Sequence, residues 1–435
     1  DHRDLHYPLR RQRQMCIRDR ICGAGIGGLS LGLSLQQLKI PFQIFESSLS
    51  IEPLGVGVNL QPNAVRELFA LGIKDPLKGI GVQTEEFGLF SKKGLEIWTE
   101  ARGLKAGYNV PQFSVHRGEL QKLLYDTLIG RSKKSSVNLG VRATGFKNLS
   151  SSVELQYLNK NTKKNETFYG DILVACDGIN SNIRKQLFPD EGDPLWNGAI
   201  LWRGLTAATP FRTGASMVMI GHDTQRFVSY PISQKDSHGN AKINWIAELK
   251  FNPEKIYMKS DWSKKVDKSK FISSFTEWSF EWINPLSLIS ETSSIYEYPM
   301  VDRDPLEKWT FGRTTLLGDA AHPTYPVGSN GASQAIIDAR KLAFHLKVNG
   351  LNETALLSYE KEMLPLTAKI TLANRSSGPD ALLQVVEDRC GGTFNNIQEI
   401  ISQSELKNHS EKYKSVAGLN IERLNNTDSI LSSLI

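Results

Sequence analysis

The stretch QMCIRDRICGAGIGG, residues 14–28, decides the fold, because its second half is a glycine-rich turn. Gly23, Gly25 and Gly28 form the pattern G-x-G-x-x-G. In this pattern the first glycine permits a tight turn, the second lets a phosphate approach the backbone, and the third lets a helix pack closely. The sequence that follows predicts a helix and then a strand that ends at Glu46. This order predicts an α/β fold with a parallel sheet and a loop that binds phosphate groups.

Glu46 lies 18 residues after Gly28, at the end of the second predicted strand. A carboxylate at this place can accept hydrogen bonds from both hydroxyls of an adenosine ribose. The alternative is a solvated carboxylate that marks the end of a strand. The order of strand, turn, helix and strand favours the first interpretation.

The residues before the glycine turn do not suit the strand that should lead into it. A central parallel strand is buried on both faces and has five or six apolar residues, whereas here only Ile21 and Cys22 fit. Burying the arginines of Arg18–Arg20 without partners is costly. We therefore expect residues 1–20 to be non-native or disordered, because MCIRDR resembles translated adapter sequence joined to a truncated gene. The alternative is an unusual strand whose arginines emerge at its start.

Composition and charge narrow the class of protein. The net charge is +6, but six arginines and three aspartates place +3 of it in residues 1–20, and no concentrated basic face predicts nucleic-acid binding. No apolar run is long enough to cross a membrane, and no secretory leader is recognisable. We expect a cytoplasmic protein with reduced thiols and no metal site, because none of the four cysteines has metal-ligand spacing: Cys16, Cys22, Cys176 and Cys390.

Hydrophobic patterning divides the rest of the chain into segments. Alternating β-branched and aromatic residues over 196–300 predict a sheet that belongs to a second domain, with a helix at 261–283. A strand, glycine turn and helix return after residue 314. The predicted organisation is therefore a Rossmann-like domain in two parts, an inserted β-sheet domain and a helical tail: 21–195 and 301–375, 196–300, and 376–435.

A second motif, LLGDAAHPTYPVGSNGASQAIIDA, spans residues 316–339. Apolar residues end a strand at Gly318–Asp319, and a tight turn then leads to a helix that starts near Ala332. Three residues shape the turn: Pro326, Gly328 and Gly331. An aspartate at a strand end can bind a polyol hydroxyl, and a helix N-terminus can stabilise negative charge on a ring carbonyl. The alternative is a loop that Asp319 merely caps.

A third motif, DILVACDGINSNIRKQLF, places Asp177–Gly178 at the end of another buried strand. Here a simple turn, with Ser181 as helix cap and Arg184 paired to Asp177, is as well supported by the residues as a ligand site. In HRGELQKLL, Arg117 stands at a helix start, where a cation opposes the helix dipole, so an anionic partner such as a pyrophosphate is indicated. A surface pair with Glu119 is the alternative.

Together these motifs resemble the FAD-dependent aromatic-ring monooxygenases, the group of p-hydroxybenzoate and salicylate hydroxylases. The matching pieces are GAGIGG followed by Glu46, HRGEL, VACDGINSNIR and the motif at 316–339. GVGVNLQPNAVREL, LWRGLT and VSYPIS look like the subgroup that contains 5-methylphenazine-1-carboxylate monooxygenase. The resemblance covers most of the chain. It implies one FAD, reduction by NADH or NADPH, capture of O2 as a flavin C4a-hydroperoxide, and hydroxylation of an aromatic small molecule, carboxylated or heterocyclic.

The resemblance also assigns roles to residues. Gly23, Gly25, Gly28 and Glu46 would bind the ADP half of FAD. Arg117 and Gln121 would reach the pyrophosphate and ribityl region, with Asp177–Gly178 near the phosphates and the nicotinamide path. Gly318–Asp319 would hold the ribityl chain. Pro326, Gly328, Asn330, Gly331 and Ala332 would follow the ring edge and form the catalytic loop, in which Ser333 replaces the Asn of several relatives and would still hydrogen-bond the ring.

On the substrate side, the predicted sheet would form the pocket floor. The candidates are Trp202, Arg203 and Tyr230 from the sheet, with His322 and Tyr325 from the loop. Aromatic walls suit a planar substrate, and Arg203 can pair with a carboxylate; each of these residues also has a purely structural interpretation. A flavoprotein oxidase or dehydrogenase and a non-catalytic flavin-binding sensor remain open, as do NADH against NADPH and monomer against homodimer.

Overall fold

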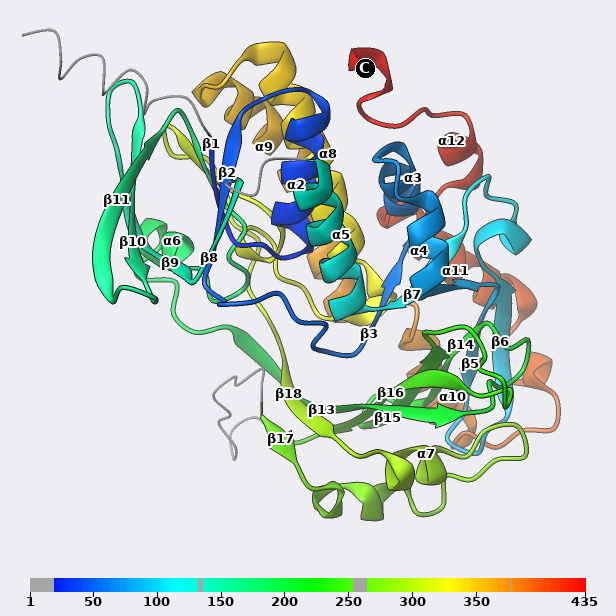
Figure 1. Ribbon diagram of the computed structural model, residues 1–435. Helices are drawn as coiled ribbons and strands as arrows, with labels where there is room; N and C mark the ends of the chain where they lie inside the picture. Colours follow the sequence, from blue (N-terminus) through cyan, green and yellow to red (C-terminus); the bar gives the residue numbers. More distant parts are fainter. Residues whose placement is uncertain (1–18, 132–135, 253–263, 377) are drawn as a thin grey trace, which may run out of the picture.

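The computed structural model describes residues 19–131, 136–252, 264–376 and 378–435. Within these residues the strands form four sheets (Figure 1). The strands are β1 (Asp19–Cys22), β2 (Phe42–Glu46), β3 (Gly57–Leu60), β4 (Gly81–Thr84), β5 (Glu86–Phe90), β6 (Glu96–Ala101), β7 (Gln112–His116), β8 (Val137–Leu139), β9 (Val141–Asn148), β10 (Val153–Asn159), β11 (Lys164–Gly170), β12 (Leu173–Ala175), β13 (Leu195–Ala208), β14 (Ser216–His222), β15 (Gln225–Pro231), β16 (Ala241–Lys250), β17 (Lys265–Val266), β18 (Ile295–Asp302) and β19 (Thr314–Leu316). The α-helices are α2 (Ile26–Gln37), α3 (Pro62–Ala70), α4 (Lys74–Ile80), α5 (Arg117–Arg131), α6 (Asn182–Leu187), α7 (Pro285–Glu291), α8 (Gly331–Asn349), α9 (Glu353–Ser376), α10 (Ala381–Cys390), α11 (Gln403–Val416) and α12 (Ile421–Asn425).

The parallel sheet confirms the predicted α/β class. Its strands run in the order β19-β12-β1-β2-β8, and each neighbouring pair is parallel. Helix α2 packs against α5 and α8, while the antiparallel sheet β11-β10-β9 lies along the other side of the parallel strands (Figure 1). Phe45 of β2 contacts the rings of Tyr157 and Phe168 across this boundary. The core therefore fills both faces of the sheet that carries the glycine turn.

Strand β1 begins at Asp19, two residues before the expected boundary, and occupies the centre of the parallel sheet. Arg20 is buried but not unpartnered, because its guanidinium donates to the carbonyl oxygen of Tyr169 and to Gln43 and lies over the Phe168 ring at 5.3 Å. Asp19 is fully buried, and neither of its carboxylate oxygens has a hydrogen-bond partner among the described residues. The expectation for residues 1–18 falls outside the described residues.

The large sheet runs in the order β17-β18-β13-β16-β15-β14-β5-β6 and lies below the parallel sheet in Figure 1. Most of its strands come from residues 196–300, as predicted, but β5 and β6 come from an earlier part of the chain, because β5 pairs in parallel with β14. The four-part division into domains stays a prediction, and this sheet extends beyond its predicted segment.

The helix expected at 261–283 is wrong for the residues that the structure describes. From residue 264 onward the segment holds the short strand β17 and two 3-10 turns, Lys268–Lys270 and Ile272–Phe275. Its aromatic residues do not form a helical stripe but pack under the large sheet, where Phe271 stacks on Trp202 with ring centroids 4.5 Å apart. Burial of aromatic side chains against the sheet thus outweighed local helix propensity.

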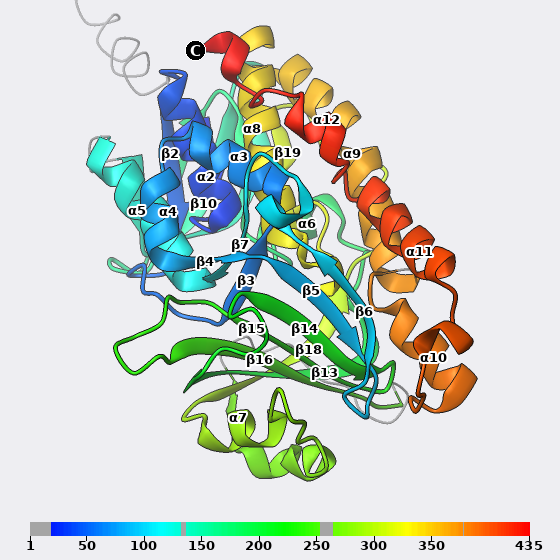
Figure 2. The same ribbon diagram turned by 90° about the vertical axis from the view of Figure 1, so that its right-hand side faces the viewer.

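The C-terminal segment is helical, as predicted, and follows one side of the molecule (Figure 2). Leu382, Leu383 and Val386 of α10 join the apolar cluster that contains Phe87 and Met219 of the large sheet. The tail therefore covers part of the sheet rather than extending into solvent. Of the helices in the described residues, none is long and apolar enough to cross a membrane.

Candidate active site

The glycine turn joins β1 to α2, as the sequence predicts. Gly23 has a φ of +104°, and a Cβ at this position would lie 2.3 Å from the carbonyl oxygen of Cys176. A Cβ at Gly28 would lie 2.0 Å from the carbonyl oxygen of Gly23, so only glycine lets the helix pack this closely. Gly25 is the N-cap of α2, and no side chain caps the helix. Its first N–H groups are therefore available to a ligand.

A cavity of about 500 Å³, called here the loop cavity, opens in front of this turn and is bordered by Gly23, Gly25, Glu46, Gln121 and Asp177, among others. Glu46 accepts a hydrogen bond of 2.7 Å from the amide of Ala24, and its other oxygen accepts one of 2.7 Å from Ser48. Gln121 donates to the carbonyl oxygen of Ala24 at 2.8 Å. These contacts hold both side chains at the glycine turn.

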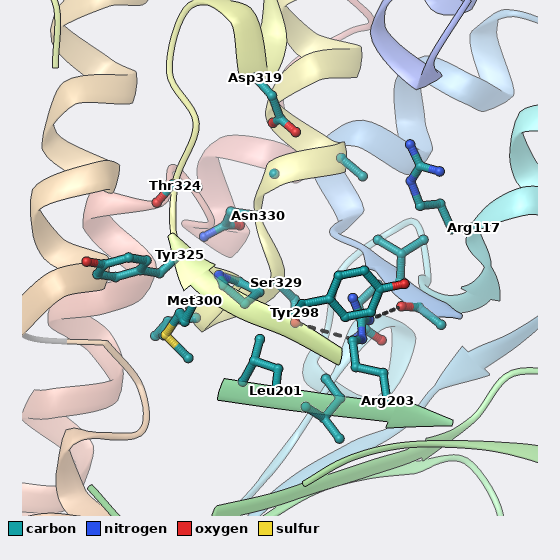
Figure 3. Close-up of a pocket in the computed structure, with 18 of the residues that line it drawn as sticks. Arg117, Leu201, Arg203, Tyr298, Met300, Asp319, Thr324, Tyr325, Ser329 and Asn330 are labelled. Atoms are coloured by element: carbon teal, nitrogen blue, oxygen red, sulfur yellow. Dashed lines mark hydrogen bonds between the residues drawn. The ribbon is translucent and has the colours of Figure 1, made fainter. Parts of the chain in front are cut away.

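Arg117 begins α5 and borders both this cavity and a second one. The pair with Glu119 does not form, because Glu119 contacts Lys242 at 3.1 Å instead. Within the described chain, the Arg117 guanidinium forms no hydrogen bond or ion pair with protein. Figure 3 shows it across the cavity from Asp319. A cation without a protein partner at a helix start is an available anion ligand.

Asp177 follows β12, and its Oδ2 accepts a hydrogen bond of 3.0 Å from the amide of Asn182. Its Oδ1 is buried without a partner, and burial raises the pKa of this carboxyl group. Ser181 caps α6, as one interpretation predicted, but Arg184 pairs with Glu191 rather than with Asp177. The turn thus has both a structural cap and an unused acceptor beside the cavity.

The second cavity, called here the sheet cavity, has a volume of about 350 Å³ and lies between the motif at 316–339 and the large sheet (Figure 3). Asp319 points into the upper part of this cavity (Figure 3). Desolvation of its carboxyl group by the surrounding protein raises the pKa of Asp319. Helix α8 begins at this cavity without a side-chain cap, since Asn330 donates to Tyr413 at 2.7 Å while its Oδ1 stays unpartnered. Ser329 holds a left-handed φ of +55°, a strained conformation in the loop between Asp319 and α8.

The floor of the sheet cavity follows from the alternation of side chains along the strands. Leu201 and Arg203 of β13 face the cavity, with Val228 and Tyr230 of β15. Trp202 points to the opposite face, donates to Glu297 at 2.9 Å and stacks in the lower core, so its assignment to the substrate pocket is wrong. Because Leu201 and Arg203 on either side of it face the cavity, strand alternation turns Trp202 away from the cavity.

Two further expectations for the loop need correction. His322 does not border the cavity, because its Nε2 contacts Asp338 at 2.5 Å and its ring packs against Trp309. Burial opposes the charged form, but the Asp338 carboxylate raises the pKa of His322 above its usual value. Ser333 is buried and accepts a hydrogen bond of 2.9 Å from the amide of Gln61, so it faces β3 and α3 rather than the cavity.

The remaining loop residues divide between the cavity wall and its support. Pro326, Asn330, Gly331 and Ala332 border the sheet cavity, as do Gly318 and Gly178. Tyr325 contributes to the wall, but its hydroxyl points away towards Asp302, and burial together with that carboxylate raises its pKa to about 12. Gly328 does not border the cavity; its backbone packs against Tyr413 of the tail.

Sequence reasoning missed several residues that border the cavities. Arg142 borders the loop cavity, and Tyr298, Met300, Arg226 and Glu248 border the sheet cavity. Arg226 lies four residues before Tyr230 on the same strand, so the two-residue period would have placed it on the same face. Placing Glu248 at the cavity would have required the pairing register of the two strands, because Glu248 of β16 lies opposite Arg226 of β15.

The two cavities suit an extended FAD. Gly25, Arg117, Cys176 and Gly178 border both of them, so one ligand can pass from the glycine turn to the large sheet. Among the residues that the structure describes, the donors and acceptors that a dinucleotide needs are offered by two helix N-termini without side-chain caps, the unpaired Arg117, and the unpartnered acceptors of Asp177 and Asn330. The residues present therefore fit the cofactor that the resemblance implies.

Comparison with known proteins decides the family. The family described as "FAD binding domain" matches residues 19–373. The chain belongs to this FAD-binding family. It is 40% identical over 359 residues to the phenazine 1,6-dicarboxylic acid hydroxylase PhzS of Lysobacter antibioticus, covering 82% of this chain and 88% of that protein. It is 29% identical over 374 residues to 3-hydroxybenzoate 6-hydroxylase 1 of Aquipseudomonas alcaligenes, covering 82% and 87%.

A solved salicylate hydroxylase substrate complex has the same fold, with a TM-score of 0.69, 21% identity, and coverage of 93% of this chain and 98% of that one. As a member of the FAD-binding family with hydroxylase relatives, the protein is an FAD-dependent aromatic hydroxylase that uses NAD(P)H and O2. The resemblance found in the sequence is thereby confirmed, and so are the cofactor and the class of reaction.

Proposed function

We propose that this FAD-dependent hydroxylase acts on a planar, fused-ring aromatic carboxylate that lies on the floor of the sheet cavity. The observation that carries the proposal is Arg203. It borders the cavity, its Nη2 donates to the carbonyl oxygen of Gly57 at 2.8 Å, and its Nε has no hydrogen-bond partner among the described residues. A half-buried arginine with a spare N–H group is suited to a carboxylate, which accepts charge-assisted hydrogen bonds.

The side chains around Arg203 support a flat, apolar ligand. Leu201, Met219, Val228 and Ile246 form an apolar floor, and Tyr298 lies beside the Arg203 guanidinium, 6.0 Å from ring centroid to Cζ. Tyr230 hydrogen-bonds to Arg203, and burial raises the pKa of its phenol, which keeps it protonated at neutral pH. This lining accepts an aromatic ring between side chains and orients its carboxylate towards one end. The relative PhzS is named for a phenazine dicarboxylic acid, which is a ligand of this shape class.

The two cavities hold FAD in an extended form in this proposal. The glycine turn and Glu46 hold the ADP half, Arg117 and Gln121 the pyrophosphate, and Asp177 with Gly178 the path of the nicotinamide. Asp319 holds the ribityl chain, and the loop from Pro326 to Ala332 follows the ring edge. Bound FAD supplies the electron transfer from NAD(P)H to O2, so that one oxygen atom enters the ring as a hydroxyl group and the other leaves as water.

Residues of the chain bind and orient the substrate and keep water out of the sheet cavity. Arg203 and Tyr230 fix the substrate by its carboxylate, and the apolar floor keeps water away from the reacting carbon. The N-terminus of α8, which has no side-chain cap, would direct its positive dipole end towards a flavin ring held in the sheet cavity and would stabilise negative charge there. We also propose a cytoplasmic location, supported by the free thiols of Cys22, Cys176 and Cys390, and a monomer or homodimer.

The test is a substrate assay on the FAD-loaded protein with phenazine-1-carboxylate and with uncharged phenazine. We expect the carboxylate to accelerate NAD(P)H oxidation and to gain 16 mass units, the mass of one oxygen atom. Arg203→Met should raise KM for the carboxylate at least about tenfold, while leaving the weak response to phenazine unchanged. A product without added oxygen would indicate an oxidase or dehydrogenase, and ligand binding without accelerated NAD(P)H oxidation would indicate a sensor. Equal effects of the variant on both compounds would contradict the role of Arg203.

A further inference from the structure

The sheet cavity has a second polar group, a carboxylate that accepts no hydrogen bond from the described residues and has only a long ion pair with Arg226. Glu248 of β16 borders the cavity and is only 5% exposed, yet within the described chain its carboxylate forms no hydrogen bond. The nearest cationic atom is Nη1 of Arg226, 4.0 Å away. Buried polar groups in folded proteins nearly always have hydrogen-bond partners, so an unpartnered carboxylate at a cavity wall indicates a ligand.

The charges around Glu248 are already balanced without it. Arg226 on β15 hydrogen-bonds to Asp380, the N-cap residue of α10, and lies 3.8 Å from Asp223 in the turn before β15. Lys250 on β16 pairs with the same Asp223 at 2.7 Å. Two cations thus face two other carboxylates. Burial raises the pKa of Glu248, although the Arg226 charge opposes this shift.

The position of Glu248 relative to Arg203 gives the cavity two distinct polar ends. Arg203 is paired with Ile246, and Glu248 is the next residue of β16 on the same face. Diagonal neighbours on a sheet face have Cα atoms roughly 7–8 Å apart. Their side chains diverge, because Arg203 reaches Gly57 while Glu248 leans towards Arg226. Leu201 is paired with Glu248 and Ile246 with Arg203, so these two apolar side chains occupy the other diagonal of the same face.

We propose that Glu248 forms a donor-binding subsite that takes a hydroxyl or ring N–H group of the substrate, at the opposite end from the carboxylate on Arg203. The subsite follows from a buried carboxylate that accepts no hydrogen bond from the described residues and from its apolar separation from Arg203. It rests on the proposed function and adds specificity to it. A second carboxylate at this end would meet the like charge of Glu248, beside an Arg226 that is already bonded to Asp380, whereas a donor would complete the hydrogen bonding of Glu248. The cavity thus selects an aromatic monocarboxylate with a donor over a dicarboxylate.

The experiment uses three ligands that differ only at one ring position: phenazine-1-carboxylate, its 6-hydroxy derivative and phenazine-1,6-dicarboxylate. Their dissociation constants are measured from changes in the flavin absorption of the FAD-loaded protein. We expect the 6-hydroxy compound to bind at least about tenfold more tightly than the dicarboxylate. In Glu248→Gln this preference should fall at least about fivefold, because the amide removes the charge that disfavours a carboxylate.

The control variant is Glu281→Gln, which makes the same chemical change at an exposed glutamate and should keep the full preference. Glu248→Gln should retain FAD and unfold at no lower temperature than the unchanged protein, since it removes a buried charge. Ligands that bind with the same preference in both proteins would overturn the subsite while leaving the proposed function intact. Failure of all three ligands to bind would overturn the proposed function, and the subsite with it.

Discussion

Asp19 provides a direct test of how the central strand is stabilised. It is fully buried in β1, and in the part of the chain that the structure describes both carboxylate oxygens lack hydrogen-bond partners. Burial, followed by repulsion from Asp171, raises the pKa of Asp19 well above its usual value. Replacing it by valine removes an unsatisfied buried group, which costs about 1–3 kcal/mol, and adds apolar burial worth about 1 kcal/mol. We therefore expect Asp19→Val to stabilise the protein by about 2–4 kcal/mol. An unfolding entropy of about 2.1 cal/mol/K per residue converts this gain to a rise in Tm of roughly 2–4 °C for a chain of this length.

The pH dependence of this gain has a definite sign. A folded-state pKa above the unfolded value means that the folded protein binds the proton more tightly, so the stability contributed by protonated Asp19 is lost as pH rises through the folded pKa. The advantage of Asp19→Val should be smallest below about pH 4 and should grow towards neutral pH. Asp19→Asn should show a smaller gain than Asp19→Val but the same growth towards neutral pH, because the growth comes from the ionisation of Asp19 in the unchanged chain.

The assay is differential scanning calorimetry of the FAD-loaded protein at pH 4.5 and 7.5 for the unchanged chain and both variants. An Asp19→Val protein that melts at the same temperature or lower at pH 7.5 would refute the reasoning. A gain that does not depend on pH would show that Asp19 is not the group responsible.

Further substitutions test the packing of the glycine turn, of the buried Glu67–Arg340 pair and of the loop before α8. Gly28→Ala should abolish soluble, yellow protein, because its Cβ would lie 2.0 Å from a backbone oxygen. Gly25→Ala should fold and only lose FAD affinity, because its Cβ would meet nothing within 4 Å. The ratio of flavin to protein absorbance distinguishes the two outcomes. Glu67→Gln should cost about 3–5 kcal/mol in urea unfolding, because it leaves the fully buried Arg340 without its charge partner at 3.1 Å, while replacing both residues by leucine should recover most of the loss. Gly328→Ala should raise the Kd for FAD at least about tenfold, since a Cβ would lie 1.6 Å from a tail hydroxyl and the φ of +72° disfavours alanine; an unchanged Kd in equilibrium dialysis would show that the loop does not hold the cofactor.

Local patterns in the sequence were sufficient for the α/β fold and for the strand, turn and helix units that carry its motifs, but not for the segment 261–283. The glycine turn, Glu46 and the motif at 316–339 each depend on residues close together in the chain, and the structure gathers them around the two cavities. Their spacing carries the information, because a tight turn or a helix start needs particular residue types at fixed positions. The resemblance, once these motifs were aligned in order, indicated the cofactor and the reaction, which the family match confirms.

The substrate end of the cavity depended on contacts between distant segments. The aromatic character of Trp202 led to its assignment to the substrate pocket, but strand alternation turns its side chain to the opposite face of the sheet. His322 does not reach the cavity because its ring contacts the Asp338 carboxylate of α8. The same sequence contained no local sign that Glu248 would lie opposite Arg226, since that pairing joins two strands across a turn. Local sequence therefore determined the backbone turns and the uncapped helix start at the glycine turn. The tertiary structure alone decided which side chains face the sheet cavity, because each strand offers two faces and only packing against other elements selects one.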